Sequence, residues 1–245
     1  MIPRHRHLLI GLIVLTLLGA AGCTENPAEE TTVQEVVTVA ITPAARHTNL
    51  AVVTCASTIN AAAFEISEAF SSQAEADLLI QLGEPNPMPG FAAQIAVEEL
   101  AIVIHRANPA GSLTLDQVQQ LFSGTIQNWE ELGGAGGTVQ VWSLLEADET
   151  RQVFIQQVLN NGLLATNTSL APSPEIMLSS IAGNHFSIGY LPKSWATQEL
   201  VSILPGVRFP VLVLAESQPQ GPAADLVSCL QGELGQQVLT AFFPN

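Results

Sequence analysis

Strand-like apolar runs alternate with helix-start signals along this chain, and that alternation most narrows the folds open to it. The strand-like runs are rich in β-branched and apolar residues: Val36–Ile41, Ala76–Leu82, Gln94–His105, Thr138–Leu145, Phe186–Leu191, Val201–Leu204 and Phe209–Leu214. The helical patterns follow N-cap signals or keep one apolar face: Thr114–Phe122, Glu149–Leu159, Pro174–Ala182 and Ala223–Phe243. The sequence therefore predicts a mixed α/β architecture with mainly parallel sheets and helices on both faces.

The segment after the first strand permits two interpretations. Thr42-Pro43 is an N-cap residue followed by proline at the first helical position, a strong helix-start signal. In one interpretation a helix covers Pro43–Ser57 and a strand covers Ala62–Ser67. In the other, Leu50–Cys55 is a strand and Thr58–Phe70 a helix, and periodicity does not separate the two. We favour the first, because Thr42-Pro43 would otherwise open no helix.

We interpret the first 35 residues as an export signal and a tether, and not as part of the folded domain. A basic segment, residues 4–7, precedes the apolar run Leu8–Leu18, which is short for a bilayer span and suits a signal peptide over residues 1–22. Small residues then lead to Cys23 in a sequence that looks like a bacterial lipobox, with Ala20 where a larger apolar residue is usual. Either Cys23 is lipidated and anchors the exported chain to the cell membrane, or the signal peptide is simply cleaved. Residues 23–35 are polar and acidic, typical of a flexible tether.

Charge narrows the choice of partners. All 22 acidic residues follow Cys23, whereas five of the seven lysines and arginines do, so the exported part carries 5 − 22 = −17. Such a field disfavours nucleic acid and anionic lipid as partners. Any charge-assisted anion site must use one of five side chains: Arg46, Arg106, Arg151, Lys193 or Arg208.

The cysteines and histidines predict neither a metal site nor a cofactor. With Cys23 lipidated, Cys55 and Cys229 remain, and they form either a disulfide between an early and the last helix or two separate buried thiols. After the predicted signal peptide, His47, His105 and His185 lie far apart in the sequence without metal-ligand spacing. The sequence also lacks the common nucleophile and metalloprotease motifs, so an enzyme is not predicted.

Two places where a predicted strand ends and a helix begins are candidate binding sites, since ligands of open α/β sheets bind there. At the first, Thr42 offers a hydroxyl, or else simply caps a helix. At the second, Asp148 is a good N-cap, and Arg151 opposes the dipole of the helix that it enters. Arg151 therefore needs a partner, which is either an anionic ligand or the neighbouring Asp148 and Glu149. The residues alone leave both roles open.

The stretch Leu121–Gly134, LFSGTIQNWEELGG, resembles the phosphate-binding lipoproteins of ABC importers and the broader type II periplasmic-binding-protein-like family. The family pattern is a helix ending in phenylalanine, a glycine turn, an isoleucine, and Asn-Trp followed by Leu-Gly. The matching residues are Phe122, Gly124, Ile126, Asn128, Trp129, Leu132 and Gly133. Ile188-Gly189-Tyr190 falls where the family's chain returns to its first lobe.

The resemblance implies two α/β lobes with a ligand in the cleft between them, in a monomer that delivers a small solute to an ABC permease. Lobe I would comprise residues 36–105 and 189–245, with a shortened first segment, and lobe II residues 106–188. The family's ligand turn reads Ser-Gly-Thr-Arg, and here it reads Asp148-Glu149-Thr150-Arg151. The ligand set implied is therefore Thr42, Asp148, Glu149, Thr150, Arg151 and Tyr190.

The two carboxylates in that turn disfavour phosphate. An ionised carboxylate about 4 Å from a phosphate oxygen costs on the order of several kcal/mol at an effective dielectric near 20. A neutral, zwitterionic or cationic solute, an oxyanion other than phosphate, or no solute at all stays open as the ligand. The alternative function is a degenerate module of the same fold with a sensory or protein-interaction role and no transported solute.

Overall fold

The computed structural model describes residues 34–60, 62–68, 76–108, 110, 112–134, 136–197, 200–202 and 206–243. Within it, Gln34–Asn245 forms one compact unit. The predicted signal peptide, Cys23 and all but the last two residues of the tether lie outside the described residues. Among the residues described, none of the helices is long and apolar enough to cross a membrane.

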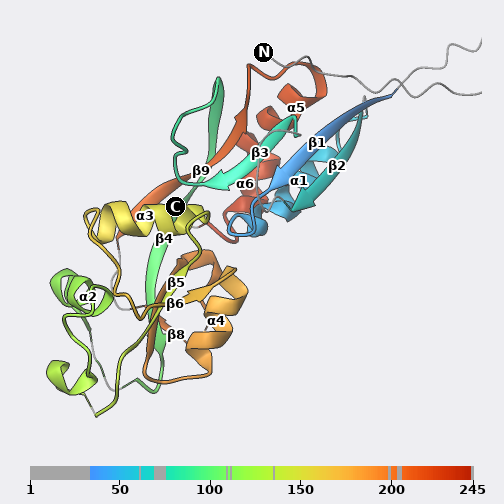
Figure 1. Cartoon of the computed structure of the whole chain (residues 1–245). Coiled ribbons are helices and arrows are strands. Elements are labelled where there is room, and N and C mark those ends of the chain that lie inside the picture. Colours follow the sequence, from blue (N-terminus) through green and yellow to red (C-terminus); the bar gives the residue numbers. More distant parts are fainter. Residues whose placement is uncertain are drawn as a thin grey trace, which may run out of the picture. The chain divides into compact units, whose positions relative to one another are not determined.

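The strands form one mixed sheet in the order β2-β1-β3-β9-β4-β7-β5-β6, and β8 also pairs with β4 (Figure 1). Their bounds are β1 Glu35–Ile41, β2 Ala62–Glu68, β3 Leu78–Leu82, β4 Phe91–His105, β5 Gln140–Leu144, β6 Ser169–Ala171, β7 Ser187–Pro192, β8 Leu200–Ser202 and β9 Val207–Ala215. β1 runs parallel to β2 and β3, and β5 runs parallel to β6 and β7. The pairs that join these groups through β4 and β9 are antiparallel.

The long strand β4 connects two halves of the sheet. Its residues Phe91–Leu100 pair with β9, and Leu100–Ile104 pair with β7. We call β2, β1, β3 and β9 the first half, and β7, β5 and β6 the second half. A strand of fifteen residues is long for a globular protein, and its continuous apolar run from Leu100 to Ile104 is buried, which explains how one strand serves both halves.

The helices cover both halves. Their bounds are η1 Arg46–Thr48, α1 Asn49–Ala56, α2 Leu115–Phe122, η3 Trp129–Leu132, α3 Glu149–Val153, η4 Phe154–Val158, α4 Pro174–Ala182, η5 Lys193–Trp195, α5 Gly221–Gln231 and α6 Glu233–Leu239. α1 packs on α5 and α6, which contact β4, whereas α4 packs on β7. Thr114 and Gln117 form a capping box at the start of α2, and Ser173 caps α4. α3 continues directly into η4, a single turn of π-helix.

Two helix predictions were wrong in their bounds. The helix expected from Pro43 begins at Arg46, because tertiary contacts use both polar groups of Thr42: its backbone N–H donates to Ile80 of β3, and its hydroxyl donates to Glu149. Thr42 therefore caps no helix, although the favoured order of a helix followed by β2 is confirmed. The predicted last helix is two helices, because Gly232 adopts an extended conformation (φ −80°, ψ 178°) between α5 and α6.

The Leu121–Gly134 stretch is structural. Asn128 caps η3, and the buried Trp129 donates its Nε1–H to the Phe186 carbonyl at 2.9 Å. Gly133 ends η3 in the left-handed region at φ 78°, where glycine is favoured. On the other side of the chain, a disulfide joins Cys55 of α1 to Cys229 of α5. The Trp129 hydrogen bond ties η3 to the segment before β7, and the disulfide ties α1 to α5.

Candidate ligand-binding cleft

Glu149 is the residue through which the turn after β5 reaches the first half of the sheet. Its Oε1 accepts a hydrogen bond from the hydroxyl of Thr42, at the end of β1. The same oxygen accepts a longer hydrogen bond, 3.4 Å, from the backbone N–H of Leu82 at the end of β3. The parallel pairing of β1 and β3 brings these two donors to one edge of the sheet. The structure thus unites Thr42 and Glu149, two residues predicted from separate strand ends.

Burial changes the acid–base behaviour of this turn. Loss of solvent, with the neighbouring Asp148 carboxylate, raises the pKa of Glu149 from 4.5 to about 7, although the hydrogen bond from Thr42 opposes the shift. Burial also raises the pKa of Asp148, whose Oδ1 accepts from the Thr150 N–H at 2.8 Å and caps α3 as predicted. Near neutral pH, Glu149 therefore exchanges between its protonated and ionised forms.

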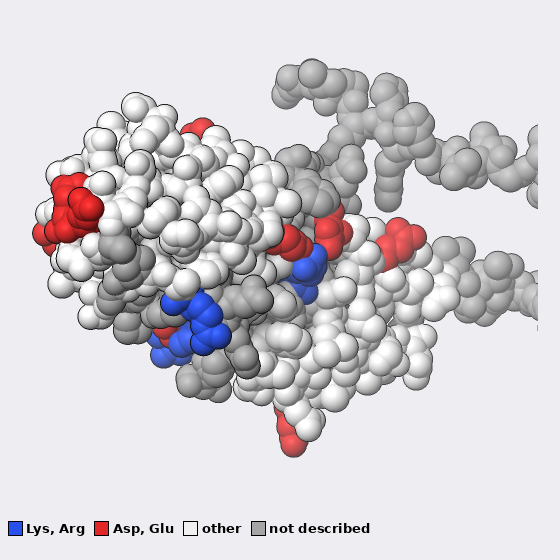
Figure 2. All heavy atoms as spheres, turned by 90° about the horizontal axis from the view of Figure 1, so that it is seen from below, with Lys and Arg blue, Asp and Glu red and all other residues white. Residues whose placement is uncertain are grey.

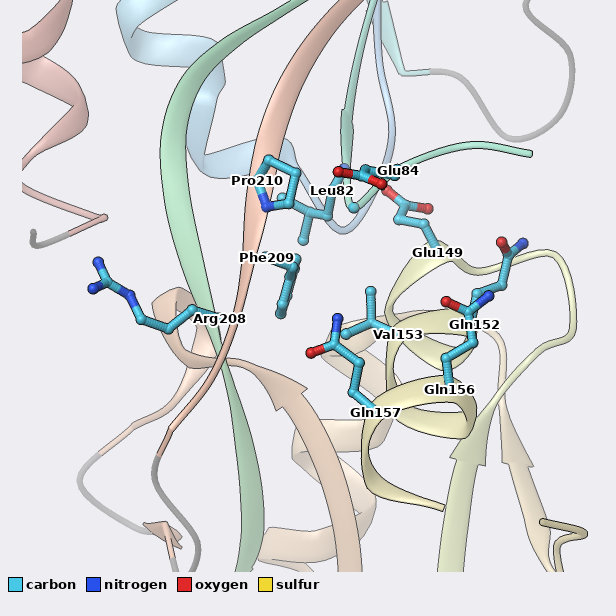
Figure 3. Close-up of a pocket in the computed structure, with 11 residues that line it drawn as sticks. Leu82, Glu84, Glu149, Gln152, Val153, Gln156, Gln157, Arg208, Phe209 and Pro210 are labelled. Carbon is cyan, nitrogen blue, oxygen red and sulfur yellow. The ribbon is translucent and has the colours of Figure 1, made fainter. Parts of the chain in front are cut away.

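A cleft of about 220 Å³ opens beside Glu149 (Figure 3). Its walls come from the ends of β3 and β9 on one side and from α3 and η4 on the other. The lining residues are Leu82, Gly83, Glu84, Glu149, Gln152, Val153, Gln156, Gln157, Arg208, Phe209 and Pro210. Gly83 allows the close approach, because a Cβ on it would lie 3.0 Å from Val153 Cγ2 in a left-handed backbone (φ 72°). The Arg208 side chain points away from the other residues drawn (Figure 3).

Three other predicted ligand residues, Thr150, Arg151 and Tyr190, do not line this cleft. Arg151 donates from Nη1 to the Leu144 carbonyl at 2.9 Å. Thr150 is fully buried, and its hydroxyl lacks a hydrogen-bond partner among the described residues. Tyr190 is also fully buried; its hydroxyl lies 2.7 Å from Ser143 Oγ, and its ring stacks on Phe154. These three side chains support the turn from behind.

A second contact joins the two halves at another place. Arg46 of η1 forms an ion pair with Glu175 of α4, and its guanidinium lies 4.6 Å from the centre of the Trp195 ring. Trp195 in turn donates its Nε1–H to the Ala44 carbonyl at 2.9 Å. Lys193 is likewise paired, with Glu99 at 2.9 Å. Two of the five lysines and arginines that follow Cys23 are thus paired with carboxylates.

The face drawn in Figure 2 carries scattered acidic groups and a few basic side chains, without a continuous basic surface. This distribution agrees with the acidic balance of the sequence. Among the described residues, no group of three or more histidine, cysteine, aspartate or glutamate side chains is arranged to hold a metal ion.

A family comparison matches residues 86–202 to the PBP superfamily domain. Over this stretch, just under half of its length, the chain is similar to a PBP domain. This match spans β4 to β8 and so includes the whole of the second half, the turn with Glu149, and α3.

Curated relatives of the PBP domain are phosphate-binding proteins. The chain is similar to phosphate-binding protein PstS of Bacillus subtilis, with 27% identity over 111 residues, 45% of this chain and 37% of that protein. It is also similar to PstS of Pseudomonas aeruginosa, with 27% identity over 124 residues, 46% of this chain and 38% of that protein. The chain thus matches well under half the length of these relatives.

Solved structures extend the likeness to the whole described fold. A phosphate ABC transporter substrate-binding protein from Clostridium perfringens, described as putative and solved with bound phosphate, superposes with a TM-score of 0.75 at 20% identity. That match covers 84% of this chain and 97% of the other. An ABC-type phosphate transport receptor from Vibrio cholerae gives a TM-score of 0.68 at 17% identity, over 84% and 98% of the two chains. The fold around the PBP domain is therefore the periplasmic-binding-protein-like fold that the sequence predicted.

Sequence reasoning on the PBP domain missed most of the cleft lining. Gln152, Gln156 and Gln157 lie on the exposed face of α3 and η4, and their spacing of four and five residues was the available signal. Gly83 and Glu84 follow a predicted strand end, which is the other signal. What no pattern indicated was that these two segments, about 70 residues apart in the chain, face each other.

Proposed function

We propose that this chain is an extracytoplasmic solute-binding protein, anchored to the cell membrane by a lipid on Cys23, that hands its ligand to an ABC permease. The observation that carries the proposal is the cleft between the strand ends of the first half and α3 of the PBP domain. Open α/β sheets bind ligands at this edge. The proposed lobes are residues 36–105 with 189–245 and residues 106–188, and the boundary between residues 188 and 189 falls within β7.

The proposal assigns roles to the turn. Glu149 faces the cleft, whereas Thr42 and Asp148 hold the turn in place through the Glu149 carboxylate and the α3 cap. Thr150, Arg151 and Tyr190 position the turn from the interior. A monomer with a small solute as its partner is consistent with these roles, and catalysis is not required of any of them.

The test is a ligand screen by thermal shift, followed by calorimetry on the full chain. A ligand that binds the folded state raises the melting temperature in proportion to RT ln(1 + [L]/Kd), about 2.7 kcal/mol at a hundredfold excess over Kd. We expect at least one small polar solute to stabilise the protein and a Gln152→Ala, Gln156→Ala double variant to reduce that shift. A broad screen without any stabilising solute would count against the proposal.

Membrane anchoring is tested separately. In cells, the wild-type chain is expected in the membrane fraction, and a Cys23→Ala variant is expected to lose the lipid label. An unlabelled wild-type chain in the soluble extracytoplasmic fraction would mean that the signal peptide is simply cleaved.

A further inference from the structure

The cleft presents acceptors, and the donors nearest to it are already used. The Thr42 hydroxyl and the Leu82 N–H both donate to Oε1 of Glu149. Oε2 of Glu149 accepts no hydrogen bond from any described residue, so it is left as a charged acceptor beside the cleft. An oxyanion entering here meets a carboxylate in place of the two donors that it would need.

The other residues that line the cleft are also mainly hydrogen-bond acceptors or neutral amides. Glu84 adds a second carboxylate, and the three glutamines add amide oxygens from the opposite wall. Arg208 lines the cleft, but its guanidinium points away from the other lining side chains (Figure 3). The cleft therefore combines two carboxylates and neutral amides without a cation aimed into it.

We propose that the cleft binds a small organic cation, an ammonium or guanidinium compound, with the Glu149 carboxylate as its charge partner. This inference rests on the proposed function and adds the ligand class to it. A cationic donor to a carboxylate makes a hydrogen bond about twice as strong as a neutral one. The volume of about 220 Å³ lies below the usual range for drug-sized ligands, which limits the solute to a small one.

Binding should then depend on pH through Glu149. Its pKa is about 7 in the empty cleft, so a cation that needs the ionised form binds more tightly as pH rises from 6 to 8. The other charged groups near it are Asp148 beside it, Glu84 across the cleft, Arg151 on α3 and Arg208 on β9. The Arg151 guanidinium donates to Leu144, and Arg208 points away, whereas Asp148 and Glu84 add to the negative field.

The experiment is isothermal calorimetry on the full chain with three sets of probes. The cations are methylammonium, choline, putrescine and agmatine; the anions are phosphate and sulfate; the neutral solutes are glucose and glycerol. Glu149→Gln keeps an oxygen that accepts from Thr42 and Leu82 but removes the charge. Glu84→Gln removes the other charge without touching those contacts, and Glu146→Gln, an exposed glutamate outside the lining, is the matched control.

We expect one or more cations to bind, with affinity rising from pH 6 to pH 8. Glu149→Gln should weaken binding about tenfold, equivalent to about 1.4 kcal/mol, and Glu84→Gln should weaken it less. Glu146→Gln should match wild type. Binding of phosphate, sulfate or a neutral solute in preference to every cation overturns this inference and supports the proposed function. If no probe of any charge binds while the protein melts cooperatively, both are overturned.

Discussion

Replacing Glu149 with glutamine should change how the stability of the folded protein depends on pH. In the wild type, Glu149 ionises near pH 4.5 when unfolded and near pH 7 when folded. Between these values the folded state holds a proton that the unfolded state has released, so the free energy of unfolding falls as pH rises. The stabilising effect of the raised pKa is fully present below pH 4.5 and is lost as pH passes through 7.

The magnitude follows from those two values. Each pKa unit of difference corresponds to about 1.36 kcal/mol, so the shift from 4.5 to about 7 amounts to about 3 kcal/mol over the full range. Between pH 5 and pH 8, about 2 to 3 kcal/mol of that change is accessible. Because Asp148 interacts with Glu149, the change belongs to the pair of carboxylates rather than to one of them.

The assay is urea denaturation of the wild type and of Glu149→Gln at pH 5 and pH 8. Many other carboxylates titrate in this range, so the informative quantity is the difference in the free energy of unfolding between variant and wild type. We expect that difference to move by about 2 to 3 kcal/mol in favour of the variant as pH rises. Glu146→Gln, at an exposed site, should show no such trend. A difference for Glu149→Gln that stays constant from pH 5 to pH 8 would refute the reasoning.

Three further predictions concern stability. Replacing Cys55 and Cys229 with alanine opens a loop of 174 residues and should cost about 5 kcal/mol by loop entropy, measured as a lower urea midpoint; an unchanged midpoint would contradict this. Gly235→Ala places a Cβ 2.5 Å from backbone atoms of α5 and should cost more than about 2 kcal/mol in urea denaturation; a loss well below that would show that the backbone moves to make room. Thr42→Val removes a donor to Glu149 and should lower the free energy of unfolding by about 1 to 2 kcal/mol in urea denaturation at pH 8. Thr58→Val is the control, because the Thr58 hydroxyl bonds only to the nearby Cys55 carbonyl. Equal losses in the two variants would show that the contact with Glu149 is weak.

The fold was predictable where local chemistry decides it. The capping box at Thr114, the Ser173-Pro174 start and the Asp148 cap each satisfy backbone donors within one turn, so their sequence is sufficient to place a helix end. The predicted helix start at Thr42 was wrong because its hydroxyl, the group that would cap a helix, is used by Glu149, while its backbone N–H pairs with β3. A threonine at the end of a strand can either cap the next helix or bond to neighbouring elements of the fold, and the local sequence does not distinguish these two roles.

The position of the candidate site in the sequence was predictable, but the contacts of its side chains were not. The turn at Asp148–Arg151 was found from its place after a strand and from the cation that opposes the helix dipole. Among the described residues, the hydrogen-bond partner of Arg151 is the Leu144 carbonyl at 2.9 Å, and neither Asp148 nor Glu149. A backbone carbonyl is present at every residue and leaves no mark in the sequence, so such a partner cannot be found by searching for complementary side chains.

The hydrogen bonds of Glu149 connect the two sides of the cleft. Thr42 and Leu82 belong to the first half of the sheet and Glu149 to the turn after β5, so this contact links the two sides of the cleft. The ion pair of Arg46 with Glu175 links them again, but both side chains are about 40% exposed, at 43% and 40%, and such pairs contribute at most about 1 kcal/mol. Separating the two sides would leave the Thr42 and Leu82 donors to water and would solvate Glu149, which then ionises at its ordinary pKa. Opening of the cleft should therefore become easier as pH rises through 7, because the ionised carboxylate gains more from water than the protonated one does. A cation bound at Glu149 acts in the opposite direction, since it stabilises the ionised form inside the closed cleft.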